Sequence, residues 1–479
     1  MTTTDYVLLV EWAVRLGMAV VVVSRKRSLY PALSWLVVVA FVPFVGAAAY
    51  LLVGELRLGR RKSQAHLATR KNAGLWNAVQ GRIRHVLQPP IPERLRSIAV
   101  LGEGQGGSPP LGGNDLLLLS DAGEVADRLI TEIDASRRHC HLCYFIIQVD
   151  DVAGRVGDAL LRARARGVKC RVLADAVGSK TFLRGSLARR LVASGVHVAA
   201  ALPVHPLRAA VARMDLRNHR KLAVIDGRIA FTGSHNLCGP IYPRKAKYGA
   251  WVDATVRVIG PAVHFLQEVF LEDWLFTTGE LCDADEHFAA TVVSSGPNFA
   301  LQVLPSGPDS PESPLVDVIA QALRLAQSRA TFTTPYFVPD DETVSALRSA
   351  ALRGVEVNVV VPRKSDHGIA QAAGRSHYGY LMEMGVRIHE YEGGLIHSKT
   401  LTVDEDFAMI GTGNLDVRSF LLNFELSLLV YDPEFTARLH FLQSSYIEKS
   451  TRLTPAQWKS RGALKSLGDN VAKLLTPLL

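Results

Sequence analysis

Two short segments of the chain carry the same side chains at the same spacing. Each has a histidine, a lysine two positions later and an aspartate five positions after the lysine; the six residues are His219, Lys221, Asp226, His397, Lys399 and Asp404. An asparagine follows each histidine by seventeen positions, with a hydroxyl residue two positions before it; these residues are Ser234, Asn236, Thr412 and Asn414. An ordinary half-buried strand accounts for a single copy of the motif. Side chains alternate between the two faces of a strand, so a histidine and a lysine two positions apart lie on the same face. Such a strand does not explain two copies that match at five positions.

These residue types suit chemistry at phosphorus. One imidazole can attack the phosphorus atom while the other protonates the leaving alkoxide. Lysines supply positive charge to the non-bridging oxygens, and hydroxyl and amide groups donate hydrogen bonds to them. We therefore expect both motifs to form one active site, with all six motif residues catalytic. Substrate-binding roles fall to Ser234, Asn236, Thr412 and Asn414.

A nucleophilic histidine must be neutral, and a carboxylate should hold its other ring nitrogen. Glu425 follows Asn414 by eleven positions, and Asp253 follows Asn236 at a longer spacing. We predict that these two carboxylates orient the histidines. The short spacing behind the second motif favours His397 as the partner of Glu425. For Asp253, a carboxylate on a strand surface is the alternative.

The elements around the two motifs repeat in the same order. In each stretch an apolar strand precedes a helix, an Arg-Gly-Val turn, a second strand and then the motif. The strands are expected at 143–148, 169–174, 331–334 and 356–361. This pattern predicts an α/β fold with two similar lobes related by a pseudo-twofold axis, and a site at their shared face.

The expected domain boundaries follow from this repeat and from composition. A transmembrane helical hairpin occupies 1–60, and a basic connecting segment with a Gly/Pro-rich linker occupies 61–113. The first lobe covers 114–290, and the second lobe with a basic C-terminal segment covers 291–479.

Two apolar runs near the N-terminus predict membrane attachment. Tyr6–Ser24 and Leu33–Val53 are each about 20 residues long, which at 1.5 Å per residue spans a hydrocarbon core. The second run has no charge, whereas the first carries Glu11 and Arg15, which can pair across one helical turn. A cleaved signal peptide is the alternative, but the chain begins without a basic region and the second run has no place in it.

The orientation of the hairpin follows from its flanking charges. Basic residues after the second run favour a cytoplasmic body at the inner membrane, although the loop at 25–27 argues for the opposite orientation.

Overall charge favours a polyanionic partner. The net charge is +9, 48% of residues are hydrophobic and 21% are charged. This composition excludes a polytopic transporter and leaves nucleic acid or an anionic lipid surface as partners.

The five cysteines lack a disulfide spacing, which indicates a reducing compartment. Cys140 and Cys143, flanked by His139 and His141, suggest a metal or redox site, but no second ligand pair accompanies them. We expect no metal and no cofactor.

The paired motifs resemble those of the phospholipase D superfamily, whose hallmark is two such His-Lys-Asp motifs. Three further segments are similar to bacterial cardiolipin synthases within it: Thr334–Asp340, Gly411–Phe420 and Asn423–Glu425. The twin apolar runs are similar too. The chain departs from the family at Cys238–Pro240 and Trp251–Thr255, which concerns the first lobe's contacts to the acceptor.

The resemblance implies transfer of a phosphatidyl group from one phosphatidylglycerol to another, which gives cardiolipin and glycerol. His219 would be the nucleophile of a phosphatidyl-histidine intermediate, and His397 the general acid and then base. Asp226 and Asp404 would support the motifs rather than contact substrate. The partner would be anionic phospholipid in the membrane, with no nucleic acid. Three alternatives stay open: a phospholipase D that releases phosphatidic acid, a superfamily nuclease, and a non-enzymatic membrane scaffold. The apolar hairpin argues against the nuclease, and the complete motif pair argues against the scaffold.

Overall fold

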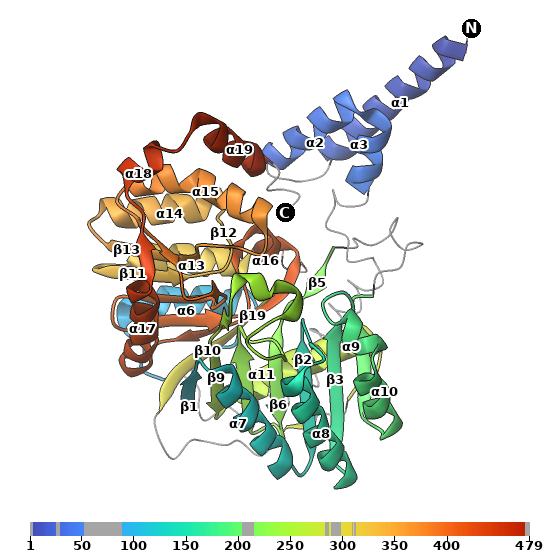
Figure 1. The fold of residues 1–479 in the computed structure, drawn as a ribbon, viewed down its shortest axis with the longest axis vertical. Helices are drawn as coiled ribbons and strands as arrows, with labels where there is room; N and C mark the ends of the chain where they lie inside the picture. Colours follow the sequence, from blue (N-terminus) through green and yellow to red (C-terminus); the bar gives the residue numbers. More distant parts are fainter. Residues whose placement is uncertain are drawn as a thin grey trace. The chain divides into compact units, whose positions relative to one another are not determined.

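The computed structural model describes residues 3–24, 29–51, 89–203, 215–282, 287–288, 298–308, 310 and 313–474. These residues divide into an N-terminal helical unit and an α/β body, which are described separately. Figure 1 shows the elements of each.

Three helices lie in the described residues of the N-terminal unit: α1 (Thr3–Ser24), α2 (Leu29–Phe41) and α3 (Pro43–Ala49). In α1, the stretch Thr4–Ser24 is long and apolar enough to cross a membrane. Glu11 and Arg15 pair as expected, with Arg15 Nη2 2.6 Å from Glu11 Oε1. Arg15 also donates from Nε to the carbonyl oxygen of Ala40 at 3.0 Å. Glu11 and Arg15 therefore have partners within the unit.

The second apolar run is not one helix, which corrects the expectation of a continuous span over 33–53. Helix α2 ends at Phe41 and Pro43 begins α3, with Val42 between them at φ −134° and ψ 72°. Proline has no N–H and clashes with the preceding turn, so a helix breaks there. The ring centroids of Trp35 and Tyr50 then lie 5.3 Å apart, which places α3 back against α2.

The body is built on a sixteen-stranded sheet. The strands of the first lobe are β1 (Leu111–Leu119), β2 (His139–Tyr144), β3 (Lys169–Asp175), β4 (His197–Ala201), β6 (Lys221–Ile225), β7 (Ile229–Gly233) and β9 (Thr255–Ile259). Those of the second lobe are β10 (Phe299–Ser306), β11 (Arg329–Thr333), β13 (Glu356–Pro362), β14 (Arg387–Tyr391), β16 (Thr400–Val403), β17 (Phe407–Gly411), β19 (Asn423–Val430) and β20 (Ser450–Arg452). The sixteenth strand is β5 (Arg217–Asn218), which pairs with β19. Four further two-residue strands form two separate pairs, β12 (Phe337–Val338) with β18 (Leu415–Asp416) and β15 (Leu395–Ile396) with β8 (Trp251–Val252).

The strand order shows the expected pseudo-twofold relation. The two lobes join where β1 pairs antiparallel with β10. From that seam the order runs β1-β9-β7-β6-β2-β3-β4 on one side and β10-β19-β17-β16-β11-β13-β14 on the other. Each strand of the first lobe thus has a counterpart at the same place in the second, which confirms two similar α/β lobes (Figure 1).

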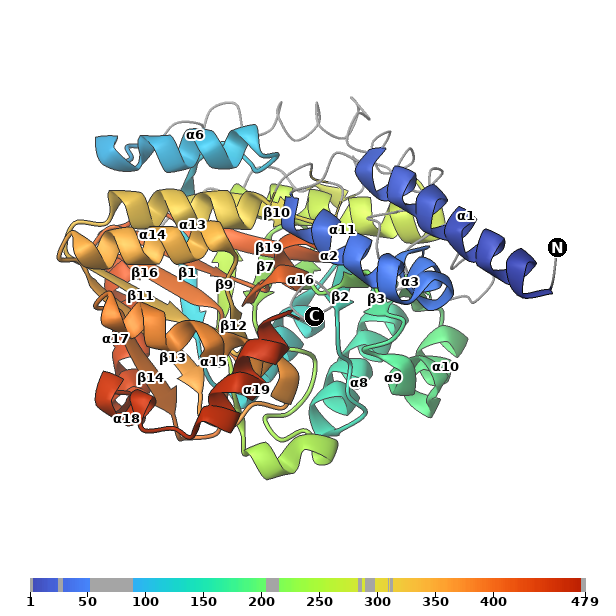
Figure 2. The same ribbon diagram turned by 90° about the horizontal axis from the view of Figure 1, so that it is seen from above.

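Helices cover the sheet in a matching arrangement. The first lobe carries α7 (Ala122–Ala135), α8 (Asp151–Ala165), α9 (Lys180–Arg184), α10 (Ser186–Ala193) and α11 (Ala262–Thr278). The second carries α13 (Pro314–Leu325), α14 (Asp341–Leu352), α15 (Gly368–Glu383), α16 (Val417–Leu421), α17 (Pro433–Glu448), α18 (Pro455–Lys459) and α19 (Ala463–Leu474). Figure 2 shows α13 and α14 side by side over the second lobe.

Equivalent aspartates start equivalent helices. Asp150 accepts a hydrogen bond from the Ala153 N–H at 3.0 Å at the start of α8, and Asp340 accepts one from the Thr343 N–H at 3.0 Å at the start of α14. Such a cap satisfies one of the free N–H groups of the first helical turn.

The segment before β1 belongs to the body and is not a linker, which corrects the boundary expected at 113. The 3₁₀ helix η2 (Glu93–Leu95) and helix α6 (Arg96–Gly104) lie there. Leu95, Ile98 and Ala99 are buried in a core cluster with residues of α13 and α14. The rest of the expected connecting segment, 61–88, lies outside the described residues.

Candidate active site

Each motif histidine follows a two-residue strand that pairs with the other lobe. Strand β5, just before His219, pairs with β19 of the second lobe, and the His219 N–H donates to the carbonyl oxygen of Phe424 at 2.9 Å. Strand β15, just before His397, pairs with β8 of the first lobe, and the His397 N–H donates to the carbonyl oxygen of Val252 at 2.8 Å. The residue after each acceptor is a carboxylate, so each histidine backbone is fixed beside an acidic side chain of the opposite lobe.

The histidine rings contact those carboxylates. His219 Nδ1 lies 2.9 Å from each carboxylate oxygen of Glu425. His397 Nδ1 lies 2.5 Å from Asp253 Oδ1. An ionised carboxylate only accepts hydrogen bonds, so each Nδ1 carries the proton and each Nε2 keeps a lone pair. The sequence spacing favoured Glu425 as the partner of His397; this is wrong, because the crossing strands exchange the partners between lobes.

The two hydroxyl residues donate hydrogen bonds to these carboxylates. Ser234 Oγ donates to Asp253 at 2.6 Å, and Thr412 Oγ1 donates to Glu425 at 2.6 Å. Both side chains are fully buried. The expected substrate-binding role of Ser234 and Thr412 is therefore corrected to a supporting one behind the histidines.

The motif lysines lie deeper than the histidines. Lys221 Nζ donates to the carbonyl oxygen of His219 at 2.6 Å, and Lys399 Nζ donates to that of His397 at 2.5 Å. Burial lowers the pKa of Lys221 to about 8, opposed by the negative charges of Glu425 and Asp253. Burial also lowers the pKa of Lys399 to about 7. Both lysines therefore titrate close to neutral pH.

Burial keeps both imidazoles neutral at pH 7. It lowers the pKa of His219 to about 4 and that of His397 to about 3, although the facing carboxylates act in the opposite direction. Burial alone would raise the pKa of Glu425, but contacts with His219 and Lys221 outweigh it and lower the pKa to about 2. The pKa of Asp253 is held well below its usual range in the same way, chiefly by His397. The site thus holds two neutral imidazoles, each on an ionised carboxylate.

Both histidines and both asparagines line one cavity of about 400 Å³, to which each lobe contributes. The other polar side chains that line it are Arg217, Lys245, Tyr336, His367, Asp416, Arg418 and Asn423. Lys245 pairs with Asp366, to which Tyr336 Oη also donates at 2.7 Å. Sequence reasoning missed Arg217, Lys245 and His367. Only Arg217 had a signal, its position two residues before His219.

The two asparagines are held differently. Asn236 Oδ1 accepts from the Ile146 N–H at 3.1 Å, and its Nδ2 donates to Tyr242 Oη at 3.0 Å. Asn414 Nδ2 donates to Asp416 Oδ2 at 3.1 Å, and its Oδ1 has no hydrogen-bond partner among the described residues.

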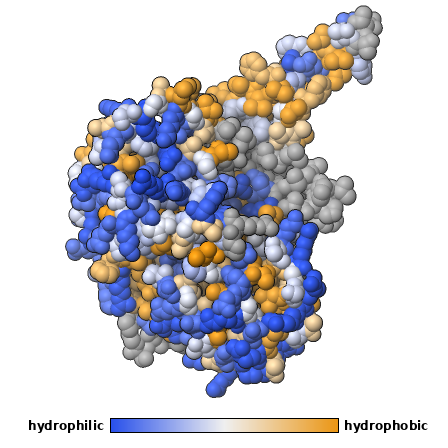
Figure 3. All heavy atoms as spheres, viewed as in Figure 1, coloured by the Kyte–Doolittle hydropathy of each residue, from blue (hydrophilic) through white to orange (hydrophobic). Residues whose placement is uncertain are grey.

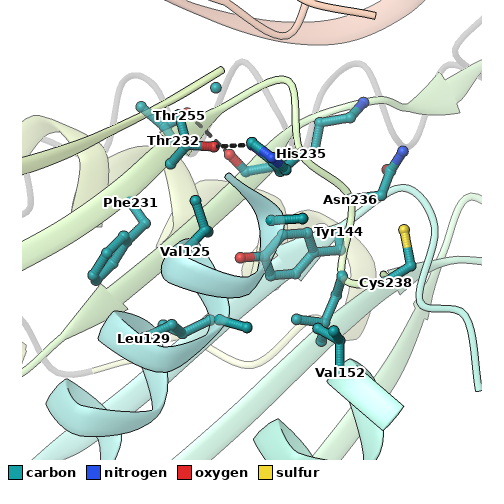
Figure 4. Close-up of a pocket in the computed structure, with 15 residues that line it drawn as sticks. Val125, Leu129, Tyr144, Val152, Phe231, Thr232, His235, Asn236, Cys238 and Thr255 are labelled. Carbon is teal, nitrogen blue, oxygen red and sulfur yellow. Dashed lines mark hydrogen bonds between the residues drawn. The ribbon is translucent and has the colours of Figure 1, made fainter. Parts of the chain in front are cut away.

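A second, much smaller cavity of about 20 Å³ lies beside the first motif (Figure 4). Figure 4 shows His235 turned toward Thr255, and its Nδ1 lies 2.9 Å from Thr255 Oγ1. Asn236, next in the chain, points away from this contact. The small cavity has room for one water molecule and not for a phospholipid headgroup.

The motif aspartates stand apart from the large cavity. Asp226 accepts hydrogen bonds from the N–H groups of 137–139 at 2.8–2.9 Å. Asp404 accepts from the N–H groups of 327–329 at 2.8–3.2 Å. Both have positive φ, 54° and 51°, at the hairpin turns that follow β6 and β16. Counting them as catalytic is corrected, because they fasten the turn at the far end of the motif strand to the start of β2 or β11.

One group of three histidines in the described part of the chain, His139, His141 and His287, has ring nitrogens within 4.8 Å of one another. His139 Nε2 and His141 Nδ1 lie 3.0 and 3.2 Å from Gln267 Oε1, so a side-chain amide already occupies the point on which these two nitrogens converge. Arg171 Nη1 lies 3.3 Å from His141 Nε2, and its positive charge opposes a bound cation. The group is part of a buried polar network, and Cys140 and Cys143 are buried free thiols beside it.

The lysine pKa values predict loss of activity at alkaline pH. A lysine stabilises phosphate charge only when protonated, so kcat/KM should fall as pH rises through about 7 to 8. At the acid limb, protonation of the nucleophilic imidazole should lower the rate as pH falls toward about 4. A pH profile of kcat/KM on a soluble short-chain substrate measures both limbs. A rate that stays flat from pH 7 to pH 10 would contradict a role for the lysine charge.

Comparison with known proteins identifies the family of the chain. A family model described as "Cardiolipin synthase, PLD-like domain" matches residues 129–274 and 319–442, and a "Phospholipase_D-nuclease N-terminal" model matches 16–55. The chain is 34% identical to Cardiolipin synthase A of Salmonella arizonae over 477 residues, which covers 99% of this chain and 98% of the relative. The chain belongs to the cardiolipin synthase family of the phospholipase D superfamily. Cardiolipin synthase A of Salmonella paratyphi B is similar to the same extent, 34% over 477 residues, with 99% of this chain and 98% of the relative covered.

As a member of the cardiolipin synthase family, the chain is a membrane-associated phosphatidyltransferase that acts on phospholipids. Among solved structures, phosphatidylserine synthase of Haemophilus influenzae is similar with a TM-score of 0.58 at 16% identity, covering 80% of this chain and 100% of that one. At this identity the likeness shows the shared fold.

Proposed function

We propose that the protein transfers a phosphatidyl group from one phosphatidylglycerol to a second one, forming cardiolipin and glycerol through a phosphatidyl-histidine. The observation that carries this proposal is the pair of neutral imidazoles in one cavity, each held by an ionised carboxylate of the opposite lobe. Two such groups suit a two-step displacement in which one attacks phosphorus and the other moves the proton.

In the first step, Nε2 of His219 attacks the phosphorus of the donor lipid. The bond from phosphorus to the glycerol oxygen breaks, and that oxygen takes a proton from Nε2 of His397. His397 is neutral in the empty site and must bind this proton first, which the negative charge of the bound donor phosphate favours. In the second step, a hydroxyl group of the acceptor lipid gives its proton back to His397. The acceptor oxygen attacks phosphorus, the bond from phosphorus to nitrogen breaks, and His219 is regenerated.

The hydrogen bonds around the carboxylates support this assignment of roles. Glu425 also accepts from Thr412, Ser419 and Asn423 at 2.6, 2.9 and 3.3 Å, which spreads its negative charge. Besides the contact with His397, Asp253 accepts one side-chain hydrogen bond among the described residues, from Ser234. Asp253 therefore keeps more of its negative charge for the imidazolium of His397, which carries the proton between the leaving and the entering oxygens.

The cavity wall supports a phospholipid acceptor over water. Arg217 of the first lobe and Arg418 of the second both line the cavity. A water molecule needs no cation to bind, whereas an acceptor lipid carries its own phosphate, for which arginine is well suited. The proposal also places the body on the cytoplasmic side of the inner membrane, because basic residues follow the second apolar run.

The test is the product distribution of the purified full chain in phosphatidylglycerol vesicles, resolved by mass. Cardiolipin and glycerol should appear in equal amounts. Arg418→Gln should raise the share of phosphatidic acid at least several-fold, because water then competes better with the acceptor. The matched control is Arg438→Gln on the exposed side of α17, which should leave the product ratio unchanged. Phosphatidic acid as the main product of the unaltered protein would identify a hydrolase and overturn the proposal.

A further inference from the structure

Three loops that border the large cavity each carry an exposed apolar side chain and an exposed lysine. Each of these loops also supplies a residue to the cavity wall: Val177, Lys245 on the 3₁₀ helix η4 (Pro243–Tyr248), and His367. The exposed apolar residues are Val177, Ile241 and Ile369, at 49%, 58% and 53% exposure. The exposed lysines are Lys180, Lys247 and Lys364. We call these six residues the cavity rim.

Helix α19 extends this surface beside the cavity. On its inner side, Ala472 is buried in one cluster with Val338 and Ala373. Val338 lines the cavity, so α19 packs directly behind the cavity wall. Asp469, also on the inner side, pairs with Arg461 at 2.7 Å. The position of α19 relative to the cavity is thus fixed by contacts within the body.

The outer face of α19 is apolar. Its exposed residues are Leu464, Leu467, Val471 and Leu474, at 86%, 59%, 50% and 77% exposure. Spacings of three and four residues place them on one stripe of the helix, opposite the buried side. Figure 3 shows apolar side chains at the surface over α19. We call these four residues the α19 stripe.

We propose that the cavity rim and the α19 stripe dock on the surface of an anionic lipid bilayer, so that the cavity opens against the lipid. This inference rests on the proposed function, in which both substrates are anionic phospholipids. An apolar helix face beside lysines suits the boundary between headgroups and acyl chains. Each lysine near an anionic surface adds electrostatic attraction. A substrate could then enter the cavity headgroup first, without leaving the bilayer completely.

The occupant of this surface can be identified by site-specific fluorescence. All five native cysteines are buried, so an exposed cysteine introduced into the full chain can be labelled selectively. Leu467→Cys reports on the α19 stripe and Ile369→Cys on the cavity rim. The control is Leu352→Cys, at a site 65% exposed at the end of α14. Since α14 runs back toward the amino end of β13, this position lies at the sheet edge opposite the cavity.

Each labelled protein is placed in phosphatidylglycerol nanodiscs. The fluorescence of the label is then quenched in separate experiments, by a nitroxide attached to a lipid and by iodide in the aqueous phase. At 467 and 369 we expect strong quenching by the nitroxide and several-fold protection from iodide; at 352 we expect the reverse. If only iodide quenches the fluorescence of the label at position 467, the α19 stripe is exposed to water and the proposal is overturned. Protection from both quenchers would show a protein cover, either a second copy or another segment of the chain, and would also overturn it.

Turnover on two substrates gives an independent measurement. The triple variant Leu464→Ser, Leu467→Ser, Val471→Ser should lose at least about fivefold in rate on phosphatidylglycerol vesicles and keep its rate on a monomeric short-chain analogue. Leu352→Ser is the matched control and should change neither rate. Equal vesicle rates for the triple variant and the unaltered protein would overturn the proposal. Quenching requires no turnover, so failure of docking is distinguishable from failure of the proposed reaction.

Discussion

Glu425→Gln should abolish the first chemical step at His219, even though Glu425 follows the second motif in sequence. His219 Nδ1 lies 2.9 Å from both oxygens of Glu425. A glutamine can turn its amide N–H toward Nδ1, which places the imidazole proton on Nε2 and removes the attacking lone pair. Loss of the correct tautomer costs about 10⁴-fold in kcat in a comparable histidine–carboxylate pair. We expect a loss of about 10³- to 10⁴-fold in turnover.

The two carboxylate variants should differ in which step they block. With a phosphatidyl donor that has a good leaving group, Glu425→Gln should form no covalent adduct. Asp253→Asn acts on His397 and should still form the adduct, because such a leaving group needs no proton, but it should resolve the adduct slowly. Glu448→Gln on the exposed side of α17 serves as the control and should behave as the unaltered protein. The opposite result, with Asp253→Asn blocking adduct formation, would show that the histidine roles are reversed.

His219→Asn and His397→Asn should each reduce steady-state turnover at least about 10³-fold, because general acid–base and nucleophilic contributions are both of this size. Steady-state rates therefore cannot separate the two roles. Trapping can do so: with a 4-nitrophenyl phosphatidyl donor, His397→Asn should release one equivalent of 4-nitrophenol per site and then stop. His219→Asn should release none.

Mass analysis of the trapped His397→Asn protein should place the phosphatidyl group on the peptide that contains His219. The control is His440→Asn on α17, outside the cavity lining, which should turn over normally. A covalent adduct on the His397 peptide of the unaltered protein would reverse the assignment. Absence of any adduct, with product formed at the normal rate, would instead indicate direct transfer between the two lipids.

The sequence determined the reacting groups and the repeat that carries them. Two motifs that match at five positions predict one shared site, because chance or strand alternation accounts for only one. The repeated order of strands and helices likewise predicts two lobes, since local apolar periodicity decides which segments are strands and which are helices. The sheet order confirms this prediction.

Spacing in the sequence predicted the wrong partner where two segments that are distant in the chain lie side by side in the fold. Glu425 lies close behind the second motif, yet the backbone pairing of β5 with β19 sets it against His219. Ser234 and Thr412 have the right type and spacing to bind substrate, but their hydroxyl groups donate to the carboxylates. A motif gives the type of a side chain and its distance along the chain, and neither reports which partner the pairing of two lobes brings to it.

The same distinction applies away from the cavity. The length and uncharged composition of the second apolar run predict one continuous helix, whereas Pro43, which lacks an N–H, divides the run into α2 and α3. Helix α6 was read as part of a linker because the segment after it is rich in glycine and proline. Its burial against α13 depends on a surface that exists only after the second lobe has folded, more than 200 residues later in the chain. The sequence therefore determines which side chains and breaks each segment carries, and long-range packing determines which other segments they contact.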